Sequence, residues 1–189
     1  MYQQILRFMK TLLILVFALI SNQVFAQNAK YELFNAPFFK DGGTLFFAIE
    51  VSSGQIYYQR DYGNAAGKWM PFGSPIPRSE KHEFTFKLYN KNQGTPESDP
   101  DLTFIALDKF NGQIYFITDS QKAEWKSFGY PIQLEASPTF TFDMRSETTQ
   151  GITYFALHEK SGQLYYMPDY GLDAGIWKKY GSEITPESK

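Results

Sequence analysis

The sequence has 189 residues, with 18 Lys and Arg against 20 Asp and Glu, and 18% of its residues are aromatic. This nearly neutral balance argues against a basic protein that binds nucleic acid or a membrane surface. The absence of cysteine excludes disulfides, thiolate metal sites and a cysteine nucleophile. Phe and Tyr at this frequency favour β-strands, because flat rings pack well across neighbours on a pleated surface.

Residues 1–26 have the pattern of an export signal. Arg7 and Lys10 supply a positive start, residues 11–20 form an apolar core, and Ala26 ends a small-residue cleavage site. We expect a mature chain of residues 27–189, secreted or periplasmic, with 16 basic against 20 acidic residues and a net charge of −4. The apolar run is too short to span a bilayer comfortably, so an uncleaved anchor is the less favoured alternative.

One short segment occurs three times in the mature chain. It reads SGQIYY at residues 53–58, NGQIYF at residues 111–116 and SGQLYY at residues 161–166, and an alanine precedes each glycine by six residues. A tryptophan follows each copy, so the agreement extends well beyond the segment itself and indicates a repeat architecture. We predict one all-β domain with three repeats, at about residues 27–79, 80–136 and 137–189.

Each repeat contains four strand candidates in a row. The first opens the repeat, the second and third flank the repeated glycine, and the fourth follows the tryptophan. The opening strands are predicted at residues 31–34, 84–89 and 140–144, and the second strands at residues 44–50, 104–108 and 154–158. Residues 90–101 are predicted to be an insertion without strand character, and no helical periodicity is found in the mature chain.

These strands predict three tandem four-stranded antiparallel meanders, arranged like propeller blades or a prism about a pseudo-threefold axis. Three units are fewer than an ordinary propeller needs to close, so the chain forms either a compact three-sheet body or half of a ring completed by a second copy. A β-trefoil is the alternative. Strand order distinguishes the two, because a meander keeps each repeat in one sheet whereas a trefoil shares strands in a common barrel.

The Ser53-Gly54 pair predicts a two-residue hairpin turn, because glycine accepts the positive φ that such turns require. In this register Ala48 faces Gln59, and side-chain alternation divides the hairpin into two faces. The apolar face, expected to be the core in every repeat, carries Phe47, Ile49, Val51, Ile56 and Tyr58. The mixed face carries Phe46, Ala48, Glu50, Gln55, Tyr57, Gln59 and Asp61.

The mixed face repeats an amide, a tyrosine and a carboxylate, the last at Asp61, Asp119 and Asp169. This combination is typical of a shallow sugar site, because the ring covers the apolar side of a sugar while the polar groups bind its hydroxyls. The alternative is structural: the amide binds the turn backbone, the tyrosine packs between repeats, and the aspartate closes a loop in an Asx turn. Recurrence in every repeat favours the structural interpretation for Gln and Asp.

The repeated tryptophans allow the same two interpretations. Each could form an exposed stacking platform, or it could fill the gap between adjacent sheets with its N–H bonded to a carbonyl. Filling is favoured, because an exposed Trp is costly on a soluble surface. The candidate ligand-binding residues are Gln55, Tyr57, Trp69, Gln113, Tyr115, Trp125, Gln163, Tyr165 and Trp177.

Residues that could carry catalysis are few. The two histidines, His82 and His158, lie at non-equivalent positions, and no carboxylate spacing singles out an acid/base pair. The acidic residues 97–101 lack the glycine turn and terminal Glu of a dedicated calcium loop. We therefore predict no catalytic residue, no metal and no cofactor.

Two turn patterns resemble known propeller repeats. Residues 61–69 and 169–177 each contain Asp-Tyr-Gly, then Gly and Trp, and so resemble the Asp-box turns of sialidase-type β-propeller blades. Residues 104–108 with the Asn-Gly-Gln at 111–113 are similar to hairpins of quinoprotein-type propeller repeats. The resemblance implies one four-stranded blade per repeat, with structural Asp and Trp. It implies no sialidase activity, because that family's arginine cluster and tyrosine–glutamate pair cannot be located in this sequence.

The leading functional hypothesis is a secreted, non-enzymatic binding module whose ligand is a glycan or a cell-surface polysaccharide. The alternative is a structural or protein-interaction module without a small-molecule ligand, in which every repeated Tyr and Trp is buried. A glycoside hydrolase with carboxylates at repeat boundaries comes third.

Overall fold

The computed structural model describes residues 30–38, 43–77, 82–91, 101–118, 123–133, 139–147 and 151–184. The predictions for the export signal, for Asp119 and for most of the 90–101 insertion therefore lie outside the described residues. Within the part of the chain that the structure describes, no helix has the length and apolarity needed to cross a membrane.

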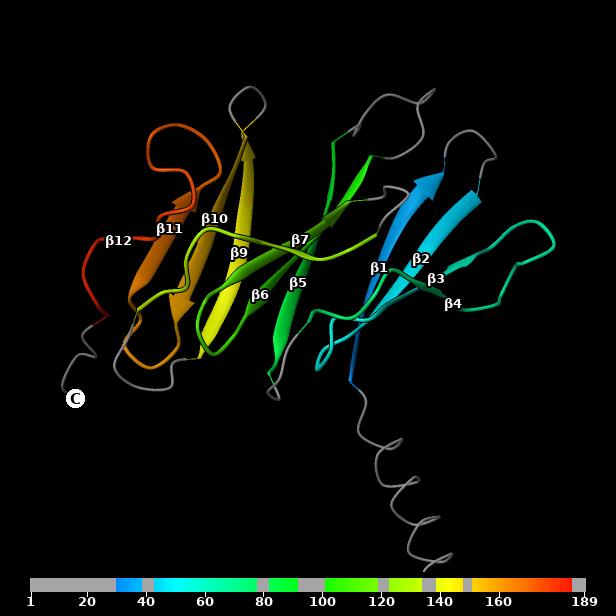
Figure 1. Ribbon diagram of the computed structural model, residues 1–189, viewed down its shortest axis with the longest axis horizontal. Helices are drawn as coiled ribbons and strands as arrows, with labels where there is room; N and C mark the ends of the chain where they lie inside the picture. Colours follow the sequence, from blue (N-terminus) through cyan, green and yellow to red (C-terminus); the bar gives the residue numbers. More distant parts are fainter. Residues whose placement is uncertain are drawn as a thin grey trace, which may run out of the picture. The chain divides into compact units, whose positions relative to one another are not determined.

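The described residues form three sheets, which we call sheets I, II and III in chain order (Figure 1). Sheet I contains β1 (Tyr31–Phe38), β2 (Gly43–Glu50), β3 (Ile56–Arg60) and β4 (Met70–Phe72). Sheet II contains β5 (Phe84–Asn90), β6 (Leu102–Asp108), β7 (Ile114–Thr118) and β8 (Lys126–Phe128). Sheet III contains β9 (Phe140–Glu147), β10 (Gly151–His158), β11 (Leu164–Pro168) and β12 (Lys178–Tyr180).

Each sheet is an antiparallel meander in which neighbouring strands follow one another along the chain. The prediction of three tandem four-stranded repeats is confirmed. Each repeat keeps its four strands in its own sheet, which is the strand order expected of meander repeats and not that of a β-trefoil. The two ends of the insertion after β5 lie side by side, because the Lys91 N–H donates to the Asp101 carbonyl at 3.0 Å.

The predicted register of the repeated hairpin was wrong by two residues. Ala48 pairs with Tyr57, not with Gln59, so the loop spans residues 51–54. The loop closes through the Gly54 N–H, which donates to the Glu50 carbonyl at 2.8 Å, while Ser53 Oγ accepts the Gln55 N–H at 3.1 Å. These bonds need four loop residues, but Gly54 still has the predicted positive φ, 69°. A shift of two residues leaves the two faces of the hairpin unchanged.

Sheet II lies between the other two sheets. At both interfaces between sheets, the apolar face of one sheet packs on the mixed face of the next sheet along the chain. The apolar face of sheet I packs on the mixed face of sheet II, with the Phe47 and Phe104 ring centroids 4.8 Å apart. The apolar face of sheet II packs in turn on the mixed face of sheet III, with the Phe128 and Tyr154 centroids 5.9 Å apart. Among the described strands, β5 lies against both β1 and β9, whereas β1 and β9 show no comparable approach.

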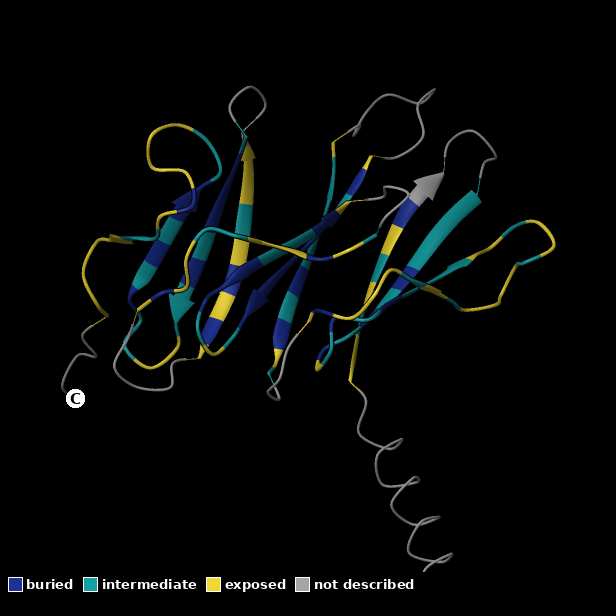
Figure 2. Cartoon of the chain, in the orientation of Figure 1, coloured by how far each residue is buried: buried dark blue, intermediate teal, exposed yellow. Residues whose placement is uncertain are grey.

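This packing corrects the prediction that the apolar face alone is the core. In sheet II both faces are buried, as Ala106 on one face and Leu107 on the other show (Figure 2). In sheet III the prediction is reversed, because Ala156 on the mixed face is buried while Leu157 on the apolar face is only half-buried. Only in sheet I is the apolar face buried while the mixed face stays open. Burial therefore follows the presence of a neighbouring sheet.

Candidate functional site

The predicted glutamines hold the fourth strand of each sheet to the hairpin. Gln113 is buried, and its Nε2 donates to the Ile114 carbonyl at 3.0 Å and to the Phe128 carbonyl at 2.9 Å. The equivalent amides make the same bond, Gln55 to the Phe72 carbonyl at 3.4 Å and Gln163 to the Tyr180 carbonyl at 3.2 Å. These amide N–H groups therefore tie the repeated hairpin to the backbone carbonyls of the fourth strand.

The repeated aspartates join the end of the third strand to the beginning of the second strand. Asp61 Oδ1 accepts the Thr44 N–H at 2.7 Å, and Asp169 Oδ1 accepts the Ile152 N–H at 2.7 Å. The aspartate thus joins β3 to β2, and β11 to β10, instead of forming the Asx turn that the sequence suggested. Its role is structural in both sheets.

Two of the three tryptophans fill the gaps between sheets. Trp125 is 7% exposed, and its Nε1 donates to the Gly54 carbonyl of sheet I at 3.1 Å. Trp177 makes the same bond to the Gly112 carbonyl of sheet II, also at 3.1 Å. Trp69 is 45% exposed. The favoured interpretation therefore holds for Trp125 and Trp177 and fails for Trp69, which has no preceding sheet in the described chain to fill against.

The exposed mixed face of sheet I contains a shallow pocket of about 370 Å³ lined by Tyr31, Ala48, Tyr57 and Trp69. The Tyr31 and Tyr57 rings meet edge to face, with centroids 6.3 Å apart. Partial burial raises the pKa of Tyr31, and the nearby Glu50 carboxylate and Tyr57 add to the rise. This pocket, with Leu33 beside it on the same face of β1, is the candidate site.

The pocket brings together only two of the predicted binding residues, Tyr57 and Trp69. The equivalents of Tyr57 make the same ring contact that Tyr57 makes with Tyr31, Tyr115 with Phe84 and Tyr165 with Phe140, but they do so where two sheets pack together. Tyr31 was not among the binding residues predicted from the sequence. Its signal was available, because Tyr31 opens its repeat at the position of Phe84 and Phe140, which marks an aromatic position in every repeat.

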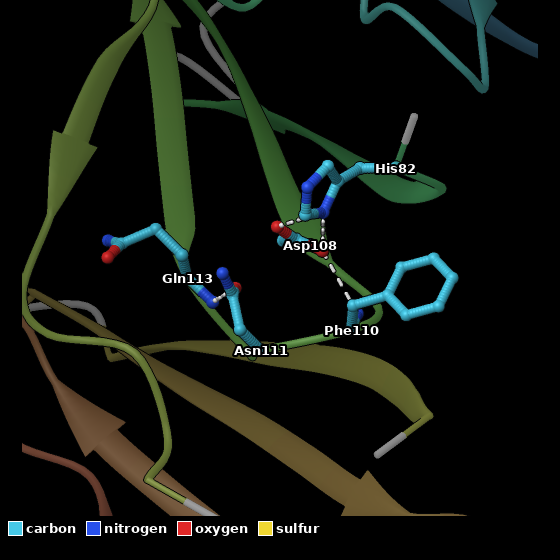
Figure 3. A network of polar contacts seen from close by, with 5 residues as sticks. All are labelled: His82, Asp108, Phe110, Asn111 and Gln113. Atoms are coloured by element: carbon cyan, nitrogen blue, oxygen red, sulfur yellow. Dashed lines mark hydrogen bonds and ion pairs between the residues drawn. The ribbon is translucent and has the colours of Figure 1, made fainter. Parts of the chain in front are cut away.

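A cluster of polar side chains lies at the hairpin of sheet II, apart from the aromatic pocket (Figure 3). Asp108 is buried; its Oδ2 lies 3.1 Å from His82 Nδ1, and its Oδ1 accepts the Phe110 N–H at 2.9 Å. Asn111 Oδ1 accepts the Gln113 N–H at 2.8 Å in the same turn. Equivalent side chains also bind their own turns, Glu50 through the Ser53 hydroxyl and His158 through Ser161 Oγ. The position of Asp108 therefore closes the hairpin in all three sheets, and His82 additionally fastens the segment before β5.

Among the described residues, no three His, Asp or Glu side chains gather so that they could hold a metal ion. The chain matches no protein-family model, no curated protein and no solved structure. Functional inference therefore rests on the three repeats, which can be compared with one another position by position.

Proposed function

We propose that the protein is a secreted, non-enzymatic interaction module that binds another protein through the mixed face of sheet I. One observation carries this proposal. Leu33 on that face is 68% exposed, whereas Phe86, its equivalent in sheet II, is 2% exposed. Tyr31 and Trp69 are exposed as well, and their equivalents in sheet II, Phe84 and Trp125, are buried.

The chemistry of this face fits a protein partner. In sheets II and III the same positions lie in the interior, covered by the apolar face of the preceding sheet. A contiguous aromatic and aliphatic surface of this kind marks an interaction site when it is left open to solvent. The pocket lining contains no charged side chain, as is typical of the centre of a protein interface.

Carbohydrate binding at the same pocket is the second candidate. The rings of Tyr31, Tyr57 and Trp69 could cover the apolar side of a glycan or a cell-surface polysaccharide, with the tyrosine hydroxyls as hydrogen-bonding groups. It ranks second because two polar groups expected to bind sugar hydroxyls are engaged elsewhere: Gln55 on the Phe72 carbonyl and Asp61 on the Thr44 N–H. The hydrolase hypothesis ranks third, because the pocket lining includes no carboxylate pair.

The test places a photo-reactive amino acid, p-benzoylphenylalanine, at position 33 of the full chain in the organism that encodes it. The matched control carries the same group at position 172, where Leu172 is fully exposed on the loop before β12. We expect a protein adduct from position 33 and none from position 172, with the partner identified by mass spectrometry. A position-33 chain that yields no protein adduct would contradict the proposal.

The second candidate is tested by titrating laminarin, mannan, dextran and chitin oligosaccharides against tryptophan fluorescence. A saturable change that disappears in Trp69→Phe, combined with no protein adduct from position 33, would favour the carbohydrate function over the protein-interaction function.

A further inference from the structure

We propose that the partner of the mixed face of sheet I is the apolar face of sheet III in a second copy of this chain. The inference rests on the proposed function, because it names the partner of the same surface. Inside the chain, each of the two sheet interfaces joins an apolar face to the mixed face of the following sheet. Among the described residues, two faces remain uncovered, the mixed face of sheet I and the apolar face of sheet III.

The apolar face of sheet III is exposed where its equivalents are buried. Ile184 is 67% exposed, whereas Ile132 at the same position after sheet II is 6% exposed, and Ile76 after sheet I is buried as well. Tyr180 is also exposed, while its equivalents Phe72 and Phe128 are half-buried. Sheet III therefore lacks a covering sheet on the side where sheets I and II each have one.

The hydrogen bonds of the interfaces point to the same pairing. At both internal interfaces the indole N–H of the following sheet donates to the carbonyl of the turn glycine of the preceding sheet, at 3.1 Å. Two equivalent groups do not take part in these two interfaces: the Trp69 indole N–H of sheet I and the Gly162 carbonyl of sheet III. In the proposed contact, Trp69 of one copy donates to the Gly162 carbonyl of the other, which fixes the register of the two sheets.

A close backbone contact repeats in the same way. A Cβ built on Gly73 would lie 2.5 Å from the Ala123 carbonyl oxygen of the next sheet, and one on Gly129 would lie 2.5 Å from the Gly175 carbonyl oxygen. Glycine is needed at both places because the neighbouring backbone approaches so closely. The end positions, Gly181 in sheet III and Gly67 in sheet I, have nothing within 4 Å of such a Cβ. The proposed contact brings this pair together.

The strands of sheet III do not contribute equally to the contact. The position of Phe34 on β1 is taken on β9 by Asp143, whose carboxylate lies 3.1 Å from Lys87 Nζ of sheet II. Burial alone would raise the pKa of Asp143, but the Met144 N–H and the Lys87 ammonium outweigh it and lower the pKa. The apolar part of the contact is therefore made by β10, β11 and β12, whose apolar residues are Phe155, Leu157, Leu164, Tyr166 and Tyr180.

A head-to-tail contact between unlike faces either closes into a ring or continues as a filament. Two copies combine six sheets, which lies within the range of four to eight blades that closed propellers use. We therefore expect a dimer that contains the contact twice.

Two exposed positions allow each face to be disrupted without touching the interior. Leu33→Glu places a charge on the mixed face of sheet I, and Ile184→Glu places one on the apolar face of sheet III. Leu172→Glu, at a fully exposed side chain of the loop between β11 and β12, is the control. Molar mass is measured by light scattering after size exclusion, and folding by circular dichroism melting.

We expect the wild-type chain and Leu172→Glu to be dimers, and Leu33→Glu and Ile184→Glu each to be folded monomers that still melt cooperatively, at a lower temperature than the dimers because association stabilises the folded chain. An equimolar mixture of the two monomeric variants should form a heterodimer, because one intact pair of faces remains. A monomeric wild-type chain would overturn the inference, and so would either variant remaining dimeric, since like faces would then be paired. If Ile184→Glu fails to fold, Tyr180→Lys replaces it.

The bond from Trp69 is tested by Trp69→Phe, which keeps a ring and removes the indole N–H. We expect the dimer to weaken about a hundredfold, because one hydrogen bond is lost at each of its two contacts and each is worth about tenfold. A dimer of unchanged affinity would contradict the proposed register.

Cross-linking at position 33 separates this inference from the proposed function. An adduct with peptides of residues 151–184 of a second copy supports both. An adduct with a different protein keeps the proposed function and overturns the self-association, and the absence of any protein adduct overturns both.

Discussion

Trp69 and Trp125 occupy the same position in the first and second repeats, yet their surroundings differ. Trp125 is buried between sheets I and II and donates to the Gly54 carbonyl, whereas Trp69 lines an exposed pocket. The surrounding strands agree as well, since β2 and β6 pair with their neighbours in the same register at Ala48 and Ala106. The difference therefore arises from the neighbouring sheet, which covers Trp125 and which sheet I lacks on this side.

This comparison indicates that one repeat sequence can serve as interior or as surface. Each sheet is built to be covered on both faces, so a series of three leaves one face of each kind open. Substitutions at matched positions of the repeats test this conclusion. They are best measured in the Leu33→Glu background, so that association does not contribute to stability.

The largest effect is expected from the tryptophans. Trp125→Ala should lower the free energy of unfolding by about 3–5 kcal/mol, because it removes a large buried side chain between two sheets. Trp69→Ala should change it by less than about 1 kcal/mol, because an exposed side chain loses little packing. Urea unfolding of both variants measures the contrast. Equal losses would mean that Trp69 is also buried in the isolated chain.

A smaller contrast is expected between two glycines with the same backbone conformation. Gly112 and Gly181 have φ of 68° and 67°, but a Cβ on Gly112 would lie 2.7 Å from Ile132 Cδ1, while one on Gly181 meets nothing within 4 Å. Gly181→Val should cost about 1–2 kcal/mol for the left-handed conformation alone. Gly112→Val should cost about 1–3 kcal/mol more because of overpacking. Chemical denaturation of both variants tests this; identical losses would show that Ile132 moves aside freely.

The smallest contrast concerns alkaline pH. Burial raises the pKa of Tyr154 strongly, with the Asp169 charge adding to it, and burial raises the pKa of Tyr31 as well. The pKa of such a tyrosine is higher in the folded state than in the unfolded state, where it is about 10. The group therefore contributes its full stability below pH 10, and this stability is lost as the pH rises above that value.

Tyr154→Phe should therefore flatten the loss of stability above pH 10 more than Tyr31→Phe does, because Tyr154 is buried between sheets while Tyr31 is exposed. Melting temperatures between pH 8 and pH 11 provide the measurement. A steeper dependence on Tyr31 than on Tyr154 would contradict the assignment of Tyr154 to the interior.

Much of the fold could be predicted from the residues because it depends on local chemistry. Gly54 requires a positive φ, and alternating side chains separate Ala48 from Ile49 wherever the chain forms a strand. The register could not be predicted, because the Gly54 N–H closes a four-residue loop on the Glu50 carbonyl, whereas the sequence pattern suggests a shorter turn. The partners of Gln113 and Asp61 were also unpredictable, since they lie on strands brought close only by folding.

Three meander repeats, the places where their hairpins turn and the residues on each face follow from the amino-acid sequence alone, because repetition and alternation are properties of the chain. Only the tertiary structure decided which copies of those residues are interior. Burial requires a second surface, and the sheets supply it in series: sheet II covers one face of sheet I, and sheet III covers one face of sheet II. Tyr31, Leu33 and Trp69 on sheet I, and Tyr180 and Ile184 on sheet III, are exposed because no sheet among the described residues covers them.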